Sequence, residues 1–131
     1  MAERQSSRDS DLQLVFVYGS LKRGMANHQQ LAGAACLGSA RLPGLRLYDL
    51  GPFPMAVAAR DDSQAILQGE LYAVTSGQLA SLDRFEGVPR LYRRQRHALA
   101  DGRAVWVYVG RPQQVRHVGA IADGQWHGPQ R

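Results

Sequence analysis

The sequence predicts one α+β domain, and three features of the chain carry that prediction. An apolar run at residues 14–18 is too short for a helix and is typical of a strand buried on both faces. Residues 75–86 have helical periodicity between a capping signal and a terminal glycine. Asp101-Gly102 separates two strand-like runs, which is the signature of a tight hairpin. Strands before and after a single well-marked helix agree with the α+β class.

Length and composition indicate a soluble globular protein. The 131 residues are enough for one domain with a core that needs no cross-links, and the hydrophobic content of 44% is ordinary. Cys36 is the only cysteine, so no internal disulfide can form. The sequence contains neither a leader-like segment nor an apolar run long enough to span a membrane. We therefore expect a cytoplasmic protein without membrane contact.

The net charge of +5 raises the question of a nucleic-acid partner. Residues 89–97 contain four arginines and a tyrosine, side chains that contact phosphates and stack on bases. On a strand, however, Arg94 and Arg96 share one face while Arg93 lies on the other. A solvated strand face is the commoner reason for such a pattern, so we do not expect nucleic acid to bind. The same charge suits an acidic small-molecule substrate.

The first part of the chain alternates short strands with turns. Residues 1–11 are polar and aperiodic, so we expect a disordered N-terminal tail before a domain at 12–110. After the first strand, residues 25–31 have helical spacing, and Pro43-Gly44 divides residues 39–47 into two strand pieces. The proline-rich residues 49–54 predict a rigid loop of the kind that walls a pocket. Further expected elements are a strand at 55–60, a turn at 61–63 and a strand at 66–74.

The second part of the chain has clearer signals. Thr75 and Gln78 have the spacing of a capping box, and Gly87 ends the helix. Strands at 91–99 and 104–109 flank the hairpin turn, and the second has apolar residues on both faces, so it should be central in its sheet. Residues 111–131 predict a loosely packed C-terminal tail, in which Trp126 is the residue able to dock on the domain.

The turn after the first strand is a candidate anion site. Gly19 can adopt backbone conformations closed to other residues. The N–H groups of Gly19, Ser20 and Leu21, gathered at one turn, can form a concavity that holds a carboxylate or a phosphate. A plain strand-to-helix turn is the commoner explanation of the same residues.

Glu86 is a carboxylate in an unfavourable position. The apolar stripe of the predicted helix is Leu79, Leu82 and Phe85, and Glu86 follows Leu82 by four residues, so it shares that stripe. The helix macrodipole disfavours a negative charge in the last turn, and partial burial would raise the pKa of the carboxyl group. These conditions suit a general base. A terminal glutamate that frays into solvent, or pairs with Arg84 or Arg90, is the alternative.

Two motifs in this order and spacing resemble the γ-glutamylcyclotransferase family. They are Tyr18-Gly-Ser-Leu-Lys, and Leu82-Asp-Arg-Phe-Glu-Gly87 followed by Leu91-Tyr-Arg-Arg. Asp49-Leu-Gly-Pro-Phe-Pro and Gly69-Glu-Leu-Tyr72 are similar to the branch that includes γ-glutamylamine cyclotransferases and AIG2-like proteins. The resemblance runs from residue 14 to residue 109. It implies a small mixed β-barrel flanked by helices, with a cavity at one end.

The resemblance also implies a reaction of transferase or lyase type. The substrate's own α-amine attacks its γ-carbonyl, which releases 5-oxoproline and expels an amine or amino acid. Glu86 matches the family's catalytic carboxylate and is expected to act as general acid and base. The substrate loop of the family matches Tyr18, Gly19, Ser20 and Leu21.

Two tyrosines and the absence of a cofactor complete the expected site. Tyr92 and Tyr108 are candidates to hydrogen-bond the substrate, although core tyrosines are as common. The mechanism needs no cofactor, and the four histidines lack metal-ligand spacing, so no metal site is expected.

The alternative function is a non-catalytic member of the same fold that binds a γ-glutamyl or other acidic compound, or a protein. An intact Glu86 favours the enzyme, because an anion binder gains nothing from a carboxylate on its apolar stripe. The leaving group, which could be an amino acid, an amine, an ε-lysyl group or an antibiotic-type acceptor, stays open at this point. The oligomeric state does too.

Overall fold

The computed structural model describes residues 12–60 and 64–129, and these residues form strands, one α-helix and two short 3-10 helices. The tail predicted for 1–11 and the turn predicted for 61–63 lie outside the described residues. The strands are β1 (Gln13–Val17), β2 (Ala35–Pro43), β3 (Leu45–Asp49), β4 (Pro54–Ala58), β5 (Ile66–Val74), β6 (Arg93–Ala98) and β7 (Ala104–Val109). The helices are η1 (His28–Leu31), α2 (Ser76–Phe85) and η2 (Pro112–Val115).

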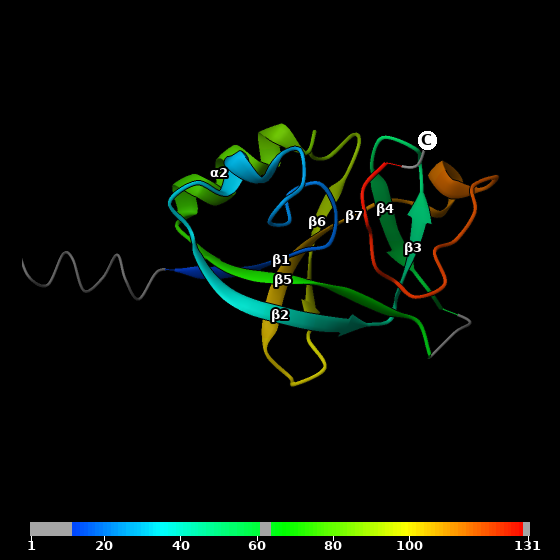
Figure 1. Cartoon of the computed structure of the whole chain (residues 1–131), viewed down its shortest axis with the longest axis horizontal. Coiled ribbons are helices and arrows are strands. Elements are labelled where there is room, and N and C mark those ends of the chain that lie inside the picture. Colours follow the sequence, from blue (N-terminus) through cyan, green and yellow to red (C-terminus); the bar gives the residue numbers. More distant parts are fainter. Residues whose placement is uncertain (1–11, 61–63, 130–131) are drawn as a thin grey trace, which may run out of the picture.

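The strands form two sheets, and α2 covers one face of the larger one (Figure 1). The five-stranded sheet has the order β2-β5-β1-β7-β6, in which only β1 and β7 run parallel. The hairpin of β3 and β4 is the second sheet. The α+β class is therefore confirmed, and β7 is an interior strand, as its apolar faces predicted.

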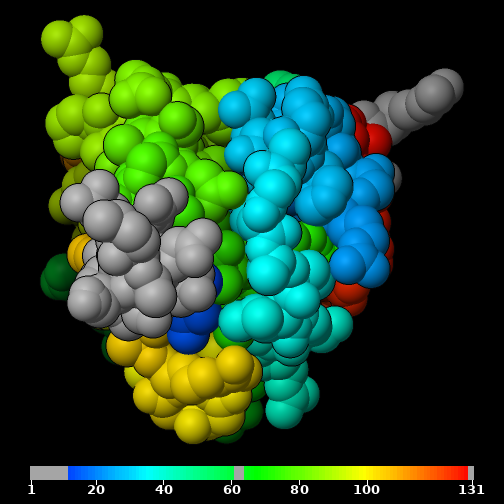
Figure 2. Space-filling view, turned by 90° about the vertical axis from the view of Figure 1, so that its left-hand side faces the viewer, coloured from blue at the N-terminus to red at the C-terminus, as the bar shows by residue number. Residues whose placement is uncertain are grey.

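Backbone hydrogen bonds join the two sheets to each other and the two edges of the larger sheet to each other. Gly110 N–H donates to Ala56 O over 2.8 Å, which joins the end of β7 to β4. Ala100 N–H donates to Arg41 O over 2.9 Å, which joins the β6–β7 turn to the outer edge of β2 (Figure 2). The pairings of the described residues do not form a continuous closed ring of strands.

The central strand β1 separates two hydrophobic clusters. Val15 and Val17 face the cluster beneath α2, while Phe16 faces the cluster that includes β3 and β4, and all three are at most 2% exposed. Burial on both faces explains why the sequence of β1 is continuously apolar. Because the chain leaves β1 at Tyr18, the turn that follows starts from a fixed position in the middle of the molecule.

The helix α2 begins and ends where its sequence predicts. Thr75 Oγ1 accepts from Gln78 N–H over 3.1 Å and Gln78 Oε1 accepts from Thr75 N–H over 2.8 Å, which is a complete capping box. Gly87 ends it with a φ of 66°. Leu79 and Leu82 are buried, but Phe85 is 39% exposed. The stripe prediction is therefore wrong for Phe85, which lies at the mouth of a cavity instead of in the core.

Two other predictions need correction. Residues 25–31 form only the short helix η1, because the segment contributes a single buried anchor, Leu31, and has no side-chain cap. Residues 111–129 are not loosely packed: Val115 and Trp126 are 6% and 2% exposed. The large apolar surface of Trp126 is enough to hold an otherwise irregular segment against the domain.

The hydroxyl of Tyr18 links β4 to β7 inside the core. It accepts from Ala56 N–H over 3.0 Å and donates to Tyr108 O over 2.7 Å, at a residue that is 6% exposed. Replacing Tyr18 with phenylalanine leaves the Ala56 N–H without its acceptor, and we expect a loss of about 1–3 kcal/mol in the free energy of unfolding. Urea denaturation measures it. Tyr48→Phe is the control, because no hydrogen bond of the Tyr48 hydroxyl is present in the described part of the chain. Equal losses in both variants would contradict the assignment.

No helix among the described residues is both long enough and apolar enough to cross a membrane.

Candidate active site

A cavity of about 260 Å³ lies where the end of β1, the β3–β4 turn and the end of α2 meet. The residues that line it come from four separate stretches of the chain, Phe16–Leu21 with Asn27, Pro52–Pro54, Phe85–Glu86 with Leu91–Tyr92, and Tyr108. The proline-rich loop thus walls a pocket, as expected. All seven residues singled out in the sequence lie around this one cavity: Tyr18, Gly19, Ser20, Leu21, Glu86, Tyr92 and Tyr108.

The loop after β1 is held closely against the β3–β4 turn. A Cβ atom at Gly19 would lie 2.8 Å from Pro54 Cγ and 3.0 Å from its Cδ, so only glycine fits at this distance. Gly19 is not among the glycines with positive φ. Glycine is therefore required at this position because the backbone lies close to Pro54, and not because it adopts a left-handed conformation.

The same loop has polar groups available to a ligand. Asn27 pins it from the side, with Nδ2 donating to Ser20 Oγ over 3.0 Å and N–H donating to Ser20 O over 2.9 Å. By contrast, no described residue accepts a hydrogen bond from the N–H groups of residues 19–21. An anion in the cavity can therefore meet backbone donors that the fold does not use.

Glu86 caps the C-terminal end of α2 and is half-buried in the cavity wall. No residue in the described ranges forms a hydrogen bond or an ion pair with its carboxylate, so neither predicted pairing, with Arg84 or with Arg90, occurs. Burial raises the pKa of Glu86 to about 7 from 4.5. At neutral pH this carboxyl group is populated in both protonation states, which a group that accepts and then returns a proton requires.

The hydroxyl groups of the three cavity tyrosines each donate a hydrogen bond to another residue of the protein. Tyr92 donates to Pro54 O over 2.7 Å, Tyr108 to Asp83 Oδ1 over 2.7 Å, and Tyr18 to Tyr108 O. Burial raises the pKa of each of these phenols, and the negative charge of Glu86 adds to the effect. Each therefore stays neutral, and its oxygen can only accept a further hydrogen bond from a ligand. Substrate contacts in which Tyr92 or Tyr108 donates are not available in this arrangement.

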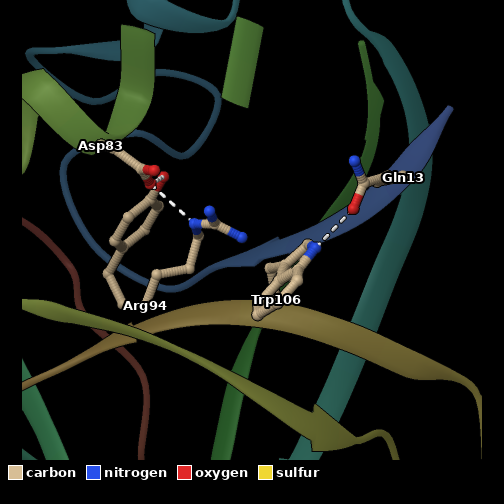
Figure 3. Close-up of polar contacts among 5 residues, drawn as sticks. Gln13, Asp83, Arg94 and Trp106 are labelled. Atoms are coloured by element: carbon tan, nitrogen blue, oxygen red, sulfur yellow. Dashed lines mark hydrogen bonds and ion pairs between the residues drawn. The ribbon is translucent and has the colours of Figure 1, made fainter. Parts of the chain in front are cut away.

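Asp83 is a polar residue of the site region that sequence reasoning missed. Its Oδ1 accepts from Arg94 Nε over 2.8 Å as well as from Tyr108, which fastens α2 to β6 and β7 (Figure 3). The signal was available, because Asp83 follows Leu79 by four residues and so lies beside the buried stripe, as Glu86 does. The reasoning that selected Glu86 therefore applied to Asp83 too.

Two of the arginines on β6 contact an aromatic ring of the neighbouring strand. The guanidinium carbons of Arg94 and Arg96 each lie 4.1 Å from the centroid of the Trp106 ring. Trp106 in turn donates through Nε1 to Gln13 Oε1 over 2.7 Å, as Figure 3 shows. The basic strand thus pairs with an aromatic residue of β7 on the face that Arg94 and Arg96 share.

The charges around the cavity restrict what it can bind. Among the described residues, its lining contains one carboxylate and no Lys, Arg or His. It combines the acceptors of Glu86 and the phenol oxygens with the free backbone donors of residues 19–21. A ligand that carries both an ammonium group and a carboxylate or polarised carbonyl matches this set. In the described residues, no group of three or more His, Cys, Asp or Glu side chains is placed to hold a metal ion.

Comparison with known proteins finds relatives that are named as γ-glutamylcyclotransferases, γ-glutamylamine cyclotransferases or AIG2-like proteins. A family model described as γ-glutamyl cyclotransferase, AIG2-like, matches residues 15–128. A Vibrio cholerae protein provisionally named a γ-glutamylcyclotransferase is 38% identical over 114 residues, which are 86% of this chain and 94% of that protein. Human γ-glutamylamine cyclotransferase is 41% identical over 90 residues, which are 62% of this chain and 58% of the human enzyme. The crystal structure of a mouse AIG2-like protein matches 92% of this chain and 97% of its own, with a TM-score of 0.72 at 23% identity, and so shares the fold.

Proposed function

This chain belongs to the γ-glutamylcyclotransferase family, in its AIG2-like branch, and from that membership we propose that it cyclises the γ-glutamyl group of a γ-glutamyl amine to 5-oxoproline. The observation that carries the proposal is the single cavity that brings Glu86 together with the free N–H groups of residues 19–21. The pKa of about 7 at Glu86 supports a proton-transfer role for this residue.

In the proposed reaction Glu86 transfers protons from the substrate's α-nitrogen to the leaving nitrogen. Its carboxylate takes a proton from the substrate's α-ammonium group, and the freed amine attacks the γ-carbonyl carbon to close a five-membered ring. The carbonyl oxygen becomes an oxyanion, which the backbone donors of residues 19–21 stabilise. Protonated Glu86 gives its proton to the leaving nitrogen as the C–N bond breaks, which releases a neutral amine. The nitrogen of the closed ring still carries one proton more than 5-oxoproline keeps, and the regenerated Glu86 carboxylate removes it. That proton leaves with the released amine, which becomes an ammonium ion. The attacking amine and the attacked carbonyl belong to one molecule. Holding the substrate in the conformation that brings them together can therefore lower the activation free energy, by up to about 7–11 kcal/mol in favourable cases.

The charge of the cavity wall supports a leaving group without a carboxylate. A γ-glutamyl amino acid carries two carboxylates, and none of the described residues in the lining provides a cation for the second one. Bringing an unpaired carboxylate into a partly buried site beside Glu86 is unfavourable. The apolar side chains at the mouth, Phe53, Phe85 and Leu91, suit an aliphatic or aromatic amine. The name of the human relative, γ-glutamylamine cyclotransferase, agrees with this choice.

A panel of matched substrates tests both parts of the proposal. γ-Glutamyl-ethylamine and γ-glutamyl-alanine differ only in the carboxylate, as do the γ-glutamyl derivatives of phenethylamine and phenylalanine. We expect release of 5-oxoproline, with kcat/KM at least about tenfold higher for the amine of each pair. Release from no member of the panel would contradict the cyclotransferase activity. Equal kcat/KM within both pairs would contradict the amine preference alone.

A further inference from the structure

Residues 111–126 bond to two loops that contribute to the cavity and to strand β3 between them, and we call this segment the strap. In Figure 1 it is the orange-to-red chain that includes η2 and passes around the β3–β4 hairpin. It lies against β3 through Asp49 N–H to Gly119 O at 3.1 Å and Ile121 N–H to Leu47 O at 2.8 Å. Its far end is Trp126, which is 2% exposed. The strap therefore has a fixed path, with each end close to a loop of the cavity.

One end of the strap holds the loop that follows Glu86. The guanidinium group of Arg111 donates to Pro89 O over 2.6 Å and to Arg90 O over 3.0 Å. Gln114 Nε2 donates to Leu91 O over 2.9 Å, and Leu91 lines the cavity. Three successive carbonyl groups of one loop thus accept hydrogen bonds from two side chains. One belongs to Gln114 of η2, and the other belongs to Arg111, the residue before η2.

The side chain of Gln114 is itself fixed. Its Oε1 accepts from Arg111 N–H over 2.6 Å, so both polar atoms of the amide are in use. The loop also closes on itself, with Leu91 N–H donating to Gly87 O over 2.9 Å. A closed loop tied at three carbonyls has little freedom to move, and it connects Glu86 to Tyr92 in the cavity wall.

The other end of the strap holds the loop after β1. Lys22 follows residues 19–21 directly and is 6% exposed, and its Nζ donates to Trp126 O over 2.7 Å. Burial lowers the pKa of Lys22, and the carboxylates of Glu70 and Asp123 oppose that effect. A buried ammonium group needs acceptors to offset its lost hydration, so this contact constrains the loop and the strap together.

We propose that the strap positions the two reacting sides of the cavity relative to one another, with Arg111 and Gln114 setting the loop after Glu86 and Lys22 setting the substrate loop. None of these three residues lines the cavity, so they are positioning residues. The expected changes in kcat and KM rest on the proposed function, whereas the expected loosening of the two loops rests on the hydrogen bonds alone. It assigns a role to a segment that the sequence suggested was a loose tail.

Kinetics of three variants of the full chain test the two ends separately. Arg111→Ala frees the loop after Glu86, and we expect kcat to fall about tenfold, since a displacement well below 1 Å at a reacting group has effects of this order. Lys22→Met removes the ammonium group and keeps the length of the side chain, and we expect KM to rise about tenfold with a smaller change in kcat. Arg116→Ala removes an exposed arginine from the same segment and should behave as wild type.

The pH profile separates positioning from a general loss of structure. Burial is what raises the pKa of Glu86, and the described phenols that its charge affects, Tyr18, Tyr92 and Tyr108, stay neutral near pH 7. Loosening the loop lets water reach Glu86, so the acid limb of kcat/KM should move to lower pH in Arg111→Ala and stay in place in Lys22→Met. Arg111→Lys, which keeps the charge and one donor, should recover most of kcat. A uniform loss of amplitude with no shift of the limb would overturn the proposal.

Amide hydrogen exchange tests the strap independently of turnover. We expect exchange to quicken by about tenfold at the hydrogen-bonded amides of each loop, with α2 unchanged in both variants. In Arg111→Ala these are the N–H groups of residues 87, 88 and 91, and in Lys22→Met they are those of residues 22 and 27, which donate to Gly19 O and Ser20 O. Faster exchange in variants of a protein that turns over no substrate would support the positioning role of the strap and contradict the cyclotransferase activity. Wild-type exchange and kinetics in both variants would reject the strap and keep the cyclotransferase.

Discussion

Replacing Glu86 with glutamine is expected to reduce the rate of 5-oxoproline release by about 10²–10⁴-fold. The amide has nearly the same shape as the carboxyl group, but it cannot take a proton from the α-ammonium group or return one to the leaving amine. The measurement is kcat/KM on the best substrate of the panel. Wild-type activity should rise with pH through about 7, where Glu86 loses its proton.

Glu70→Gln is the control for that experiment. Glu70 lies outside the cavity lining, and its Oε1 accepts from Arg23 N–H over 2.8 Å and from the Tyr72 hydroxyl over 3.0 Å. Glutamine keeps an oxygen at that place, so we expect near wild-type turnover. If Glu86→Gln retained wild-type turnover as well, proton transfer would have to be assigned to another group.

The same Glu86→Gln substitution should stabilise the protein above pH 7. The pKa of Glu86 is about 7 in the folded protein and 4.5 in its ordinary state, so between these pH values the folded protein holds a proton that the unfolded chain has lost. The stability of the wild type therefore falls as pH rises through this window, and the loss is complete above it. A shift of this size corresponds to about 3 kcal/mol.

Urea denaturation at pH 5 and pH 8 measures this effect. The Glu86→Gln variant lacks the titrating group, so its advantage over the wild type should be small at pH 5 and largest at pH 8. Together with the loss of turnover, greater stability would separate a functional residue from a structural one. An equal difference at both pH values would contradict the burial of an ionised Glu86.

Gly19→Ala is expected to lower kcat/KM by up to about 10²-fold. The added Cβ would lie 2.8 and 3.0 Å from ring carbons of Pro54, and a proline ring cannot rotate away. The loop after β1 must therefore move outward, which displaces the N–H groups of residues 19–21 from the substrate. We expect weaker binding of 5-oxoproline by calorimetry as well as slower turnover.

The control for Gly19→Ala is Gly119→Ala. A Cβ at Gly119 meets no atom within 4 Å, and its backbone conformation is open to alanine. That variant should keep wild-type activity and affinity. Wild-type affinity in Gly19→Ala would show that the close contact with Pro54 does not set the position of the substrate loop.

Short-range features of the sequence predicted the secondary structure well where the physical cause is local. The capping box of Thr75 and Gln78, the end of α2 at Gly87 and the hairpin turn at Gly102 depend on residues within a few positions of each other. The buried strand β1 followed from its apolar residues alone. The weak spacing at residues 25–31 failed because one buried leucine does not sustain a longer helix.

Side-chain periodicity also placed Glu86 at the inner face of α2, and two motifs indicated the family. Periodicity could not say which inner residues meet the core and which meet a cavity. The sequence assigns both Phe85 and Glu86 to the apolar stripe, but in the structure both line the cavity. Whether a residue of the apolar stripe meets the core or the cavity depends on which other elements pack against it, and those elements lie far away in the sequence.

By itself, the sequence determined the α+β class, the order of the elements, the inward position of Glu86 and the family. Only the tertiary structure decided which polar groups remain available to a substrate. The hydroxyls of Tyr18 and Tyr92 form hydrogen bonds with Ala56 and Pro54, while the N–H groups of residues 19–21 have no acceptor among the described residues. Lys22 likewise finds its acceptor at Trp126, at the other end of the chain. Hydrogen bonds between distant segments form only when packing brings those segments together, and no local pattern of residues specifies them.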